Sequence, residues 1–225
     1  MFSKLISGVA ISFAGTGALL FIAAGTLRWP AGWLFLIEMY GSGLAIGIAL
    51  AKRDPALLAE RLAPIVQRGQ ESWDRFATAT ALVLFIGWIL LMGADAVRFG
   101  YSHVPFWARF PGAAGLLLAM YIVHLAFRAN TFAAPVVKIQ RERGHKVITA
   151  GPYRYVRHPM YAGAMILFLS TPLLLGSWYG LAMAPVLIAL LAIRALMEER
   201  TLSDKLDGYA AYATRVRYRL IPLVW

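Results

Sequence analysis

Two polar segments stand out from a largely apolar chain: KIQRERGHKVITAGPYRYVRHPMY at residues 138–161 and RALMEERTL at residues 194–202. They flank one apolar hairpin near the end of the chain. Ionisable side chains beside membrane-spanning segments commonly line a polar cavity or pair with one another. We therefore predict that these two segments form a site for a charged ligand and that the other apolar runs form its scaffold.

The composition is typical of a membrane protein. Of the 225 residues, 60% are hydrophobic and 15% are charged, whereas soluble domains have about 45–50% apolar and about 25% charged residues. The net charge of +11 comes from basic residues between the apolar runs, as in cytoplasmic loops. Anionic lipid headgroups are therefore the expected partner, and no nucleic acid is expected. The chain has no cysteine, which excludes thiolate nucleophiles and thiolate metal sites.

Six apolar runs predict an all-α fold, a polytopic integral membrane helical bundle of about six spans. A helix needs about 20 apolar residues to cross a bilayer. The last two runs are shorter, each contains a proline, and Gly176-Ser177 separates them, which predicts a tight C-terminal helical hairpin. In the second run, Gly43 and Gly47 are predicted to allow close helix packing. The runs are residues 5–27, 31–51, 76–97, 106–127, 160–175 and 178–193.

An even number of spans places both termini on the same side of the membrane. That side then carries 19 of the 22 Lys and Arg residues, and the other side carries only Arg28, Arg98 and Arg109. Because cytoplasmic loops are enriched in Lys and Arg, both termini and both polar segments are predicted to be cytoplasmic. We expect an N-terminal transmembrane region of four spans at residues 1–128 and a C-terminal region at residues 129–225. LLAERL, at residues 57–62, predicts a short helix on the membrane surface.

Residues 151–161 are predicted to form a constrained loop that leads into a helix. Gly151-Pro152 interrupts helical structure. The proline after His158 disfavours helical geometry at that histidine, and Pro159 suits a first helical turn. Free backbone N–H groups at such a helix start favour an anion. We interpret the unit of His158-Pro159 and Tyr161 as functional, whereas Arg154 and Arg157 are expected to anchor the loop at lipid headgroups.

Arg194 and Glu198 form the other half of the predicted site. They are four residues apart on the last helix and therefore lie on one face. Either they form a structural salt bridge, or they line a polar cavity together with the loop before the hairpin. Glu199 and Arg200 point to another face of the helix and are expected to be solvated only.

The chain resembles the isoprenylcysteine carboxyl methyltransferase family, within the integral-membrane methyltransferases that include phospholipid methyltransferases. The resemblance is carried by GPYRYVRHPMYAG at residues 151–163, EERTL at residues 198–202 and YAAYATRVRYRLIP at residues 209–222. It covers residues 130–222, and the first four spans match only in character. It implies an S-adenosyl-L-methionine-dependent methyltransferase with a cytosolic cofactor pocket beside the last hairpin. These motifs are specific for the superfamily and not for a substrate.

The resemblance also implies roles for individual residues. Glu198 would hold the amino group of the cofactor, and Arg194 would orient the carboxylate of the acceptor as the catalytic residue. Besides Glu198, the cofactor pocket would be lined by Gln140, His145, Lys146, Val147, Ile148, Tyr153, His158, Pro159, Met160 and Tyr161.

Several functions remain open at this point. The expected reaction is carboxyl O-methylation of a lipidic or prenylated acceptor, because a carboxylate arrives ionised and needs no general base. The alternatives are a phospholipid amine N-methyltransferase, a sterol-reductase-like enzyme that uses NADPH, and a membrane scaffold that only holds anionic lipid. Glu38 and Asp95 fit either polar contacts between helices or a substrate passage. His124 is expected at a helix boundary, and the four histidines lack metal-ligand spacing.

Overall fold

The computed structural model describes all 225 residues and contains helices and no strands. Five segments are long and apolar enough to cross a membrane, and α6 is a shorter apolar helix. The predicted all-α, polytopic bundle is confirmed, and the chain is a multi-pass integral membrane protein. The α-helices are α1 (Phe2–Ala24), α2 (Pro30–Arg53), α3 (Pro55–Arg61), α4 (Ser72–Gly93), α5 (Arg109–Ala129), α6 (Pro159–Leu175), α7 (Trp178–Lys205) and α8 (Tyr209–Arg215).

Short tight helices extend or connect these elements. The π-helix η1 (Ala94–Phe99) continues α4, and the 3-10 helix η2 (Phe106–Ala108) leads into α5. Two more 3-10 turns, η3 (Arg141–Arg143) and η4 (Gly151–Arg154), lie in the polar segment before α6. The short helix predicted from LLAERL is confirmed as α3.

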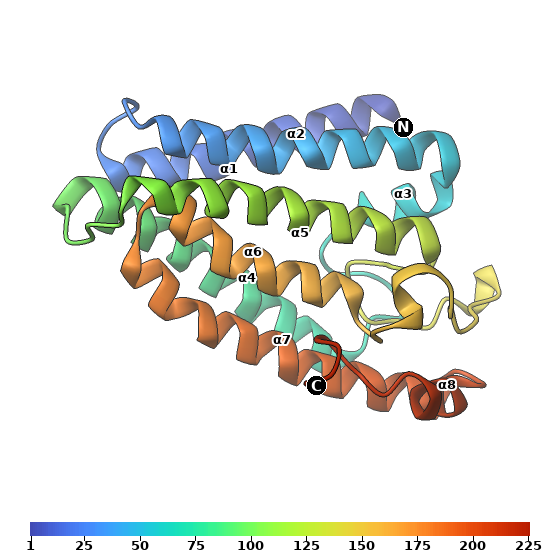
Figure 1. Cartoon of the computed structure of the whole chain (residues 1–225). Coiled ribbons are helices and arrows are strands. Elements are labelled where there is room, and N and C mark those ends of the chain that lie inside the picture. Colours follow the sequence, from blue (N-terminus) through green and yellow to red (C-terminus); the bar gives the residue numbers. More distant parts are fainter.

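The long helices lie side by side, and the polar segments gather at one end of the bundle (Figure 1). The N-terminus, α3, residues 130–157 and α8 lie at this end, which we call the polar end. The turn between α6 and α7 lies at the opposite end. The hairpin of α6 and α7 therefore brings the loop before α6 and the last turns of α7 to the same place.

Glycines allow α6 to lie against α5. A Cβ on Gly112 would overlap the backbone of Leu174, and one on Gly115 would overlap Ser170. A Cβ on Gly163 would press on the carbonyl of Ala119. This close contact fixes where the first turn of α6, and with it His158, sits at the polar end.

The prediction for the glycine pair in α2 holds at one position only. A Cβ on Gly47 would overlap the side chain of Leu5 in α1, so Gly47 permits close packing. Gly43 borders open space and meets no neighbouring helix, so the packing prediction for it was wrong.

Asp95 holds the turns at the end opposite the polar end. Its Oδ2 accepts hydrogen bonds from Ser102 (2.6 Å) and from Ser177 (2.5 Å), which itself caps α7 by accepting from the N–H of Gly180. Asp95 is buried. Of the two alternatives left open for this residue, the structure shows a polar contact, which joins η1 to the turns before α5 and α7.

Candidate functional site

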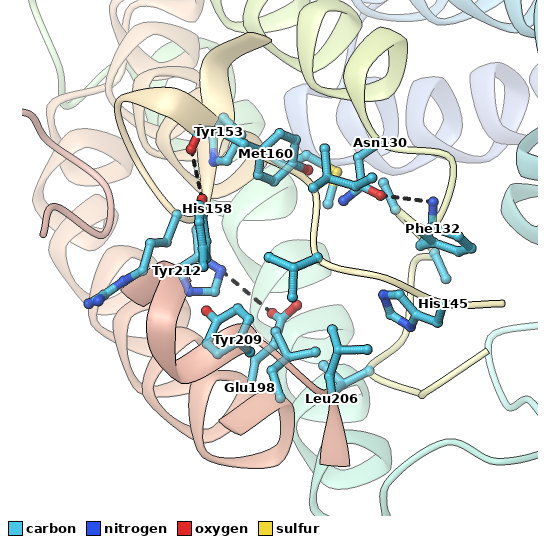
Figure 2. Close-up of a pocket in the computed structure, with 18 of the residues that line it drawn as sticks. Asn130, Phe132, His145, Tyr153, His158, Met160, Glu198, Leu206, Tyr209 and Tyr212 are labelled. Carbon is cyan, nitrogen blue, oxygen red and sulfur yellow. Dashed lines mark hydrogen bonds and ion pairs between the residues drawn. The ribbon is translucent and has the colours of Figure 1, made fainter. Parts of the chain in front are cut away.

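A cavity at the polar end is enclosed by residues 130–161, the end of α7, and α8 (Figure 2). Both polar segments contribute to it, as the sequence predicted. Ten of the predicted cofactor residues line the cavity: His145, Lys146, Val147, Ile148, Tyr153, His158, Pro159, Met160, Tyr161 and Glu198. Two predicted site residues, Gln140 and Arg194, are not among the lining residues.

Glu198 and His158 converge in this cavity. The Glu198 carboxylate accepts a hydrogen bond from the Tyr161 hydroxyl (2.6 Å) and lies 3.9 Å from Nδ1 of His158. The rings of His158 and Tyr161 stack with centroids 5.3 Å apart. The side chain of Glu198 is 23% exposed, so its carboxylate is held by two neighbours and still faces the cavity. Glu198 is also the only acidic residue that lines it.

Glu199 is a structural centre, and the expectation that it is only solvated was wrong. Its carboxylate pairs with Nε of Arg157 (2.7 Å), with Nε2 of His158 (3.1 Å) and with Nε of Arg219 (2.9 Å). Arg157 is buried and also donates to the carbonyl of Ala213 (3.1 Å), so it does not anchor at headgroups. The C-terminal segment folds back and covers this face of α7, which the helical pattern alone does not reveal.

The same C-terminal segment also occupies the start of α6. The backbone N–H groups of Arg157 and His158 donate to the carbonyls of Tyr218 and Arg219, each at 2.9 Å. Those N–H groups are therefore not free for an anion, and the anion site predicted there from backbone donors was wrong at both residues. The function of these bonds is to fix the position of His158.

Arg194 is engaged by two groups that the sequence did not predict as its partners. Its Nε donates to Oδ1 of Asp74 (2.8 Å), and its Nη2 donates to the carbonyl of Pro135 (3.0 Å). The Arg194–Glu198 salt bridge considered as an alternative does not form; Glu198 pairs with Tyr161 and His158 instead. The guanidinium lies 5.6 Å from the ring centroid of Tyr161, behind the cavity wall.

Asp74, at the start of α4, joins three parts of the site. It is fully buried, and its Oδ2 accepts from the backbone N–H of Val137 (2.8 Å) and from Nε2 of Gln70 (2.9 Å). Because Val137 lines the cavity, Asp74 connects the cavity wall to Arg194. The sequence feature that could have indicated this role is the position of Asp74 as an acidic residue in the first turn of a membrane span.

Gln140 shapes the loop that carries His145. It is fully buried, and its Nε2 donates to the carbonyl of Phe132 (2.9 Å). Its backbone N–H donates to Nδ1 of His145 (3.3 Å), whose ring stacks on Phe132. Burial, reinforced by the charge of Arg143, lowers the pKa of His145. The imidazole is therefore neutral at pH 7, which leaves Nδ1 able to accept this bond.

Tyr153, Tyr209 and Tyr212 form an aromatic wall of the cavity. The last two belong to the C-terminal tail, to which the sequence assigned no role. The hydroxyl of Tyr212 donates to the carbonyl of Tyr153 (2.8 Å), as Figure 2 shows. The hydroxyl of Tyr209 is buried without a hydrogen-bond partner. Burial raises the pKa of all three phenols, that of Tyr212 to about 12, so they are neutral donors at pH 7. The free Tyr209 hydroxyl is available to a polar ligand.

Comparisons with known proteins identify relatives of this chain. Residues 107–207, which include the hairpin and both halves of the cavity, match the phospholipid methyltransferase family. The chain is similar to a protein-S-isoprenylcysteine O-methyltransferase of Schizosaccharomyces pombe, with 31% identity over 173 residues, 67% of this chain and 72% of the relative. It is also similar to protein-S-isoprenylcysteine O-methyltransferase B of Arabidopsis thaliana, with 36% identity over 83 residues, which cover 42% of that protein.

Proposed function

Because this chain belongs to the protein-S-isoprenylcysteine O-methyltransferase family of membrane methyltransferases that use S-adenosyl-L-methionine, we propose that its cavity binds this cofactor and that it methylates a prenylated carboxylate. The observation that carries the proposal is the convergence of Glu198, His158 and Tyr161 on one cavity. The comparisons do not support the reductase or the scaffold.

The lining residues fit the chemistry of this cofactor. The cofactor has a cationic amino group and a cationic sulfonium, and Glu198 is the only carboxylate that faces the cavity. The Tyr209 hydroxyl is buried without a partner and supplies a hydrogen bond to a polar group. Aromatic rings from Tyr153, Tyr209 and Tyr212 offer flat faces for an adenine ring and for a cationic sulfur.

The proposed reaction requires little acid–base catalysis by the residues of the chain. When bound, the cofactor supplies a methyl group on a sulfonium; an acceptor carboxylate oxygen bonds to the methyl carbon while the carbon–sulfur bond breaks and leaves its electron pair on sulfur. No proton is transferred, so the residues need only align the two groups and exclude water. Glu198, held by Tyr161 and His158, fixes one partner, and the buried aromatic wall excludes solvent.

An apolar groove next to the cavity supplies a route for the acceptor chain. It has a volume of about 320 Å³ and lies between α1, α2, α3, α5 and α6. Met160 lines the cofactor cavity and also packs against the cluster of apolar residues that borders the groove. A prenyl chain from the membrane would lie in this groove. Its polar end would lie beside Met160, in the partition that separates the groove from the cofactor cavity.

We also propose that the polar end faces the cytoplasm, where its basic loops contact anionic lipid headgroups. Its loops and helix ends carry 19 of the 22 Lys and Arg residues. The chain has no cysteine, so a single cysteine can report the orientation. Thr149→Cys, at an exposed position, is expected to react with a membrane-impermeant thiol reagent from the cytoplasmic side only. Reaction from the opposite side would contradict this orientation.

The proposed function is tested by binding and transfer measured on the same purified protein. Calorimetry in detergent is expected to show binding of S-adenosylhomocysteine, the demethylated product, and no competition by NADPH. Labelled cofactor is expected to transfer its methyl group to a prenylcysteine carboxylate and to give a base-labile ester. Folded protein that does not bind S-adenosylhomocysteine, or a base-stable labelled amine from a lipid extract, would refute the proposed cofactor or the proposed acceptor, respectively.

A further inference from the structure

Arg61 is the only charged side chain among the sixteen residues that line the apolar groove. It is the last residue of α3, which lies at the polar end of the bundle (Figure 1). Its guanidinium lies 4.5 Å from the ring centroid of Phe127, which is also a groove residue. A cation at one end of an otherwise apolar groove matches an amphiphile with a negatively charged head.

No acidic residue pairs with Arg61. None of the ion pairs in the structure involves it, and the neighbouring Glu60 is paired with Lys138 at 2.6 Å. Its one hydrogen bond, from Nη1 to the carbonyl of Ala133, is long at 3.3 Å. Burial and the nearby charge of Arg194 lower the pKa of Arg61 to about 10, so it is still charged at neutral pH. A half-buried charge without an acidic partner is costly, and an anionic ligand would reduce that cost.

Arg194 is in the opposite situation. Two of its donors are engaged by Asp74 and by the carbonyl of Pro135, and it does not line the cofactor cavity or the groove. A guanidinium binds a carboxylate most strongly through two parallel N–H donors. Arg61 has such donors free, whereas Arg194 already uses Nε and Nη2.

We propose that Arg61 binds the carboxylate of the acceptor while the acceptor's apolar chain lies in the groove, an assignment that rests on the proposed function. Ala133 supports this placement, because it accepts a hydrogen bond from Arg61 and also lines the cofactor cavity. A carboxylate on Arg61 is therefore next to the partition between groove and cavity. Arg194 becomes a positioning residue that supports this partition through Tyr161 and Pro135. The site selects single-chain amphiphilic carboxylates, and the guanidinium of Arg61, which has no acidic partner, disfavours an ammonium acceptor.

The test compares two ligands that differ only in charge, an N-acetyl-S-prenylcysteine and its primary amide, bound to purified protein in detergent. Wild-type protein is expected to bind the carboxylate about tenfold to a hundredfold more tightly than the amide, the range for a charge-assisted hydrogen bond. Arg61→Gln is expected to remove this preference, and Arg61→Lys to restore part of it. Arg53→Gln, which removes one positive charge from an exposed site on α2, is the matched control and is expected to keep the preference.

The outcomes separate this assignment from the proposed function. S-adenosylhomocysteine binding is measured on every variant and is expected to be unchanged in Arg61→Gln, which also shows that the variant is folded. An Arg61→Gln protein that still prefers the carboxylate as wild type does would overturn the assignment and leave the proposed function intact. A wild-type protein that does not distinguish the two ligands would also overturn it. Because the comparison needs no turnover, it decides the role of Arg61 independently of methyl transfer, and thermal unfolding of each variant shows that it is folded where S-adenosylhomocysteine does not bind.

Discussion

Glu198→Ala is expected to weaken binding of S-adenosylhomocysteine by about a hundredfold, within the range for removing one partner of a desolvated charge pair. Glu198 is the only acidic residue that lines the cavity, which also contains the basic residues Lys138, Lys146 and Arg157. Without the Glu198 carboxylate, no acidic residue would line the cavity, and nothing there would offset the positive charge of a cationic amino group. The loss would also leave the buried Tyr161 hydroxyl without its acceptor. Isothermal calorimetry in detergent measures the change.

Two further variants separate charge from fold. Glu198→Gln keeps an acceptor for Tyr161 and removes only the charge. It is therefore expected to fold as wild type and yet to bind S-adenosylhomocysteine more weakly than wild type does. Glu142→Gln removes an acidic residue from an exposed position in the neighbouring loop, outside the cavity, and is the matched control. The assigned role of Glu198 is wrong if Glu198→Ala binds S-adenosylhomocysteine as tightly as the control does.

Asp74→Ala is expected to lower the apparent unfolding temperature by roughly 10 °C. Breaking a buried ion pair by removing one partner costs about 3–5 kcal/mol, and each kcal/mol lowers Tm by about 2–4 °C in a chain of this size. Asp74 is fully buried and neutralises Arg194. Its removal would also leave the N–H of Val137 without an acceptor. Thermal unfolding in detergent, followed by tryptophan fluorescence, measures the shift.

The effect of Asp74 on ligand binding is expected to be indirect. Val137 lines the cavity, so loosening it would weaken S-adenosylhomocysteine binding less than Glu198→Ala does. Asp74→Asn keeps an acceptor for Val137 and is expected to give an intermediate Tm. Asp204→Ala, at an exposed position near the end of α7, is the control and is expected to leave Tm within a degree or two of wild type. An Asp74→Ala protein as stable as this control would contradict the structural role.

The helices were predictable from sequence because a chain in lipid must satisfy its backbone hydrogen bonds within each segment. A run of about 20 apolar residues therefore specifies a helix almost regardless of what surrounds it. This is why the apolar runs, and the short helix α3, appear close to their predicted positions. Local sequence also determined the start of α6, since Pro159 follows His158 directly.

The part of the candidate site formed by His158 and Glu198 was predictable for a related reason. His158 and Glu198 lie at the two ends of one hairpin, and a tight turn between antiparallel helices brings those ends together whatever the rest of the bundle does. The structure places them 3.9 Å apart. Tyr209 and Tyr212 were not assigned, because the path of the tail over α7 depends on contacts with Arg157 and His158 rather than on any local pattern.

The sequence by itself determined that the chain is a membrane bundle of helices, which runs are helical, and that the two polar segments meet at one end. Only the tertiary structure decided which charges are paired. Asp74 pairs with Arg194, 120 residues away in the sequence, and Glu60 pairs with Lys138. Arg61 therefore has no acidic partner beside the apolar groove. An apolar run fixes a helix but not its rotation or its neighbours, and an ion pair depends on both.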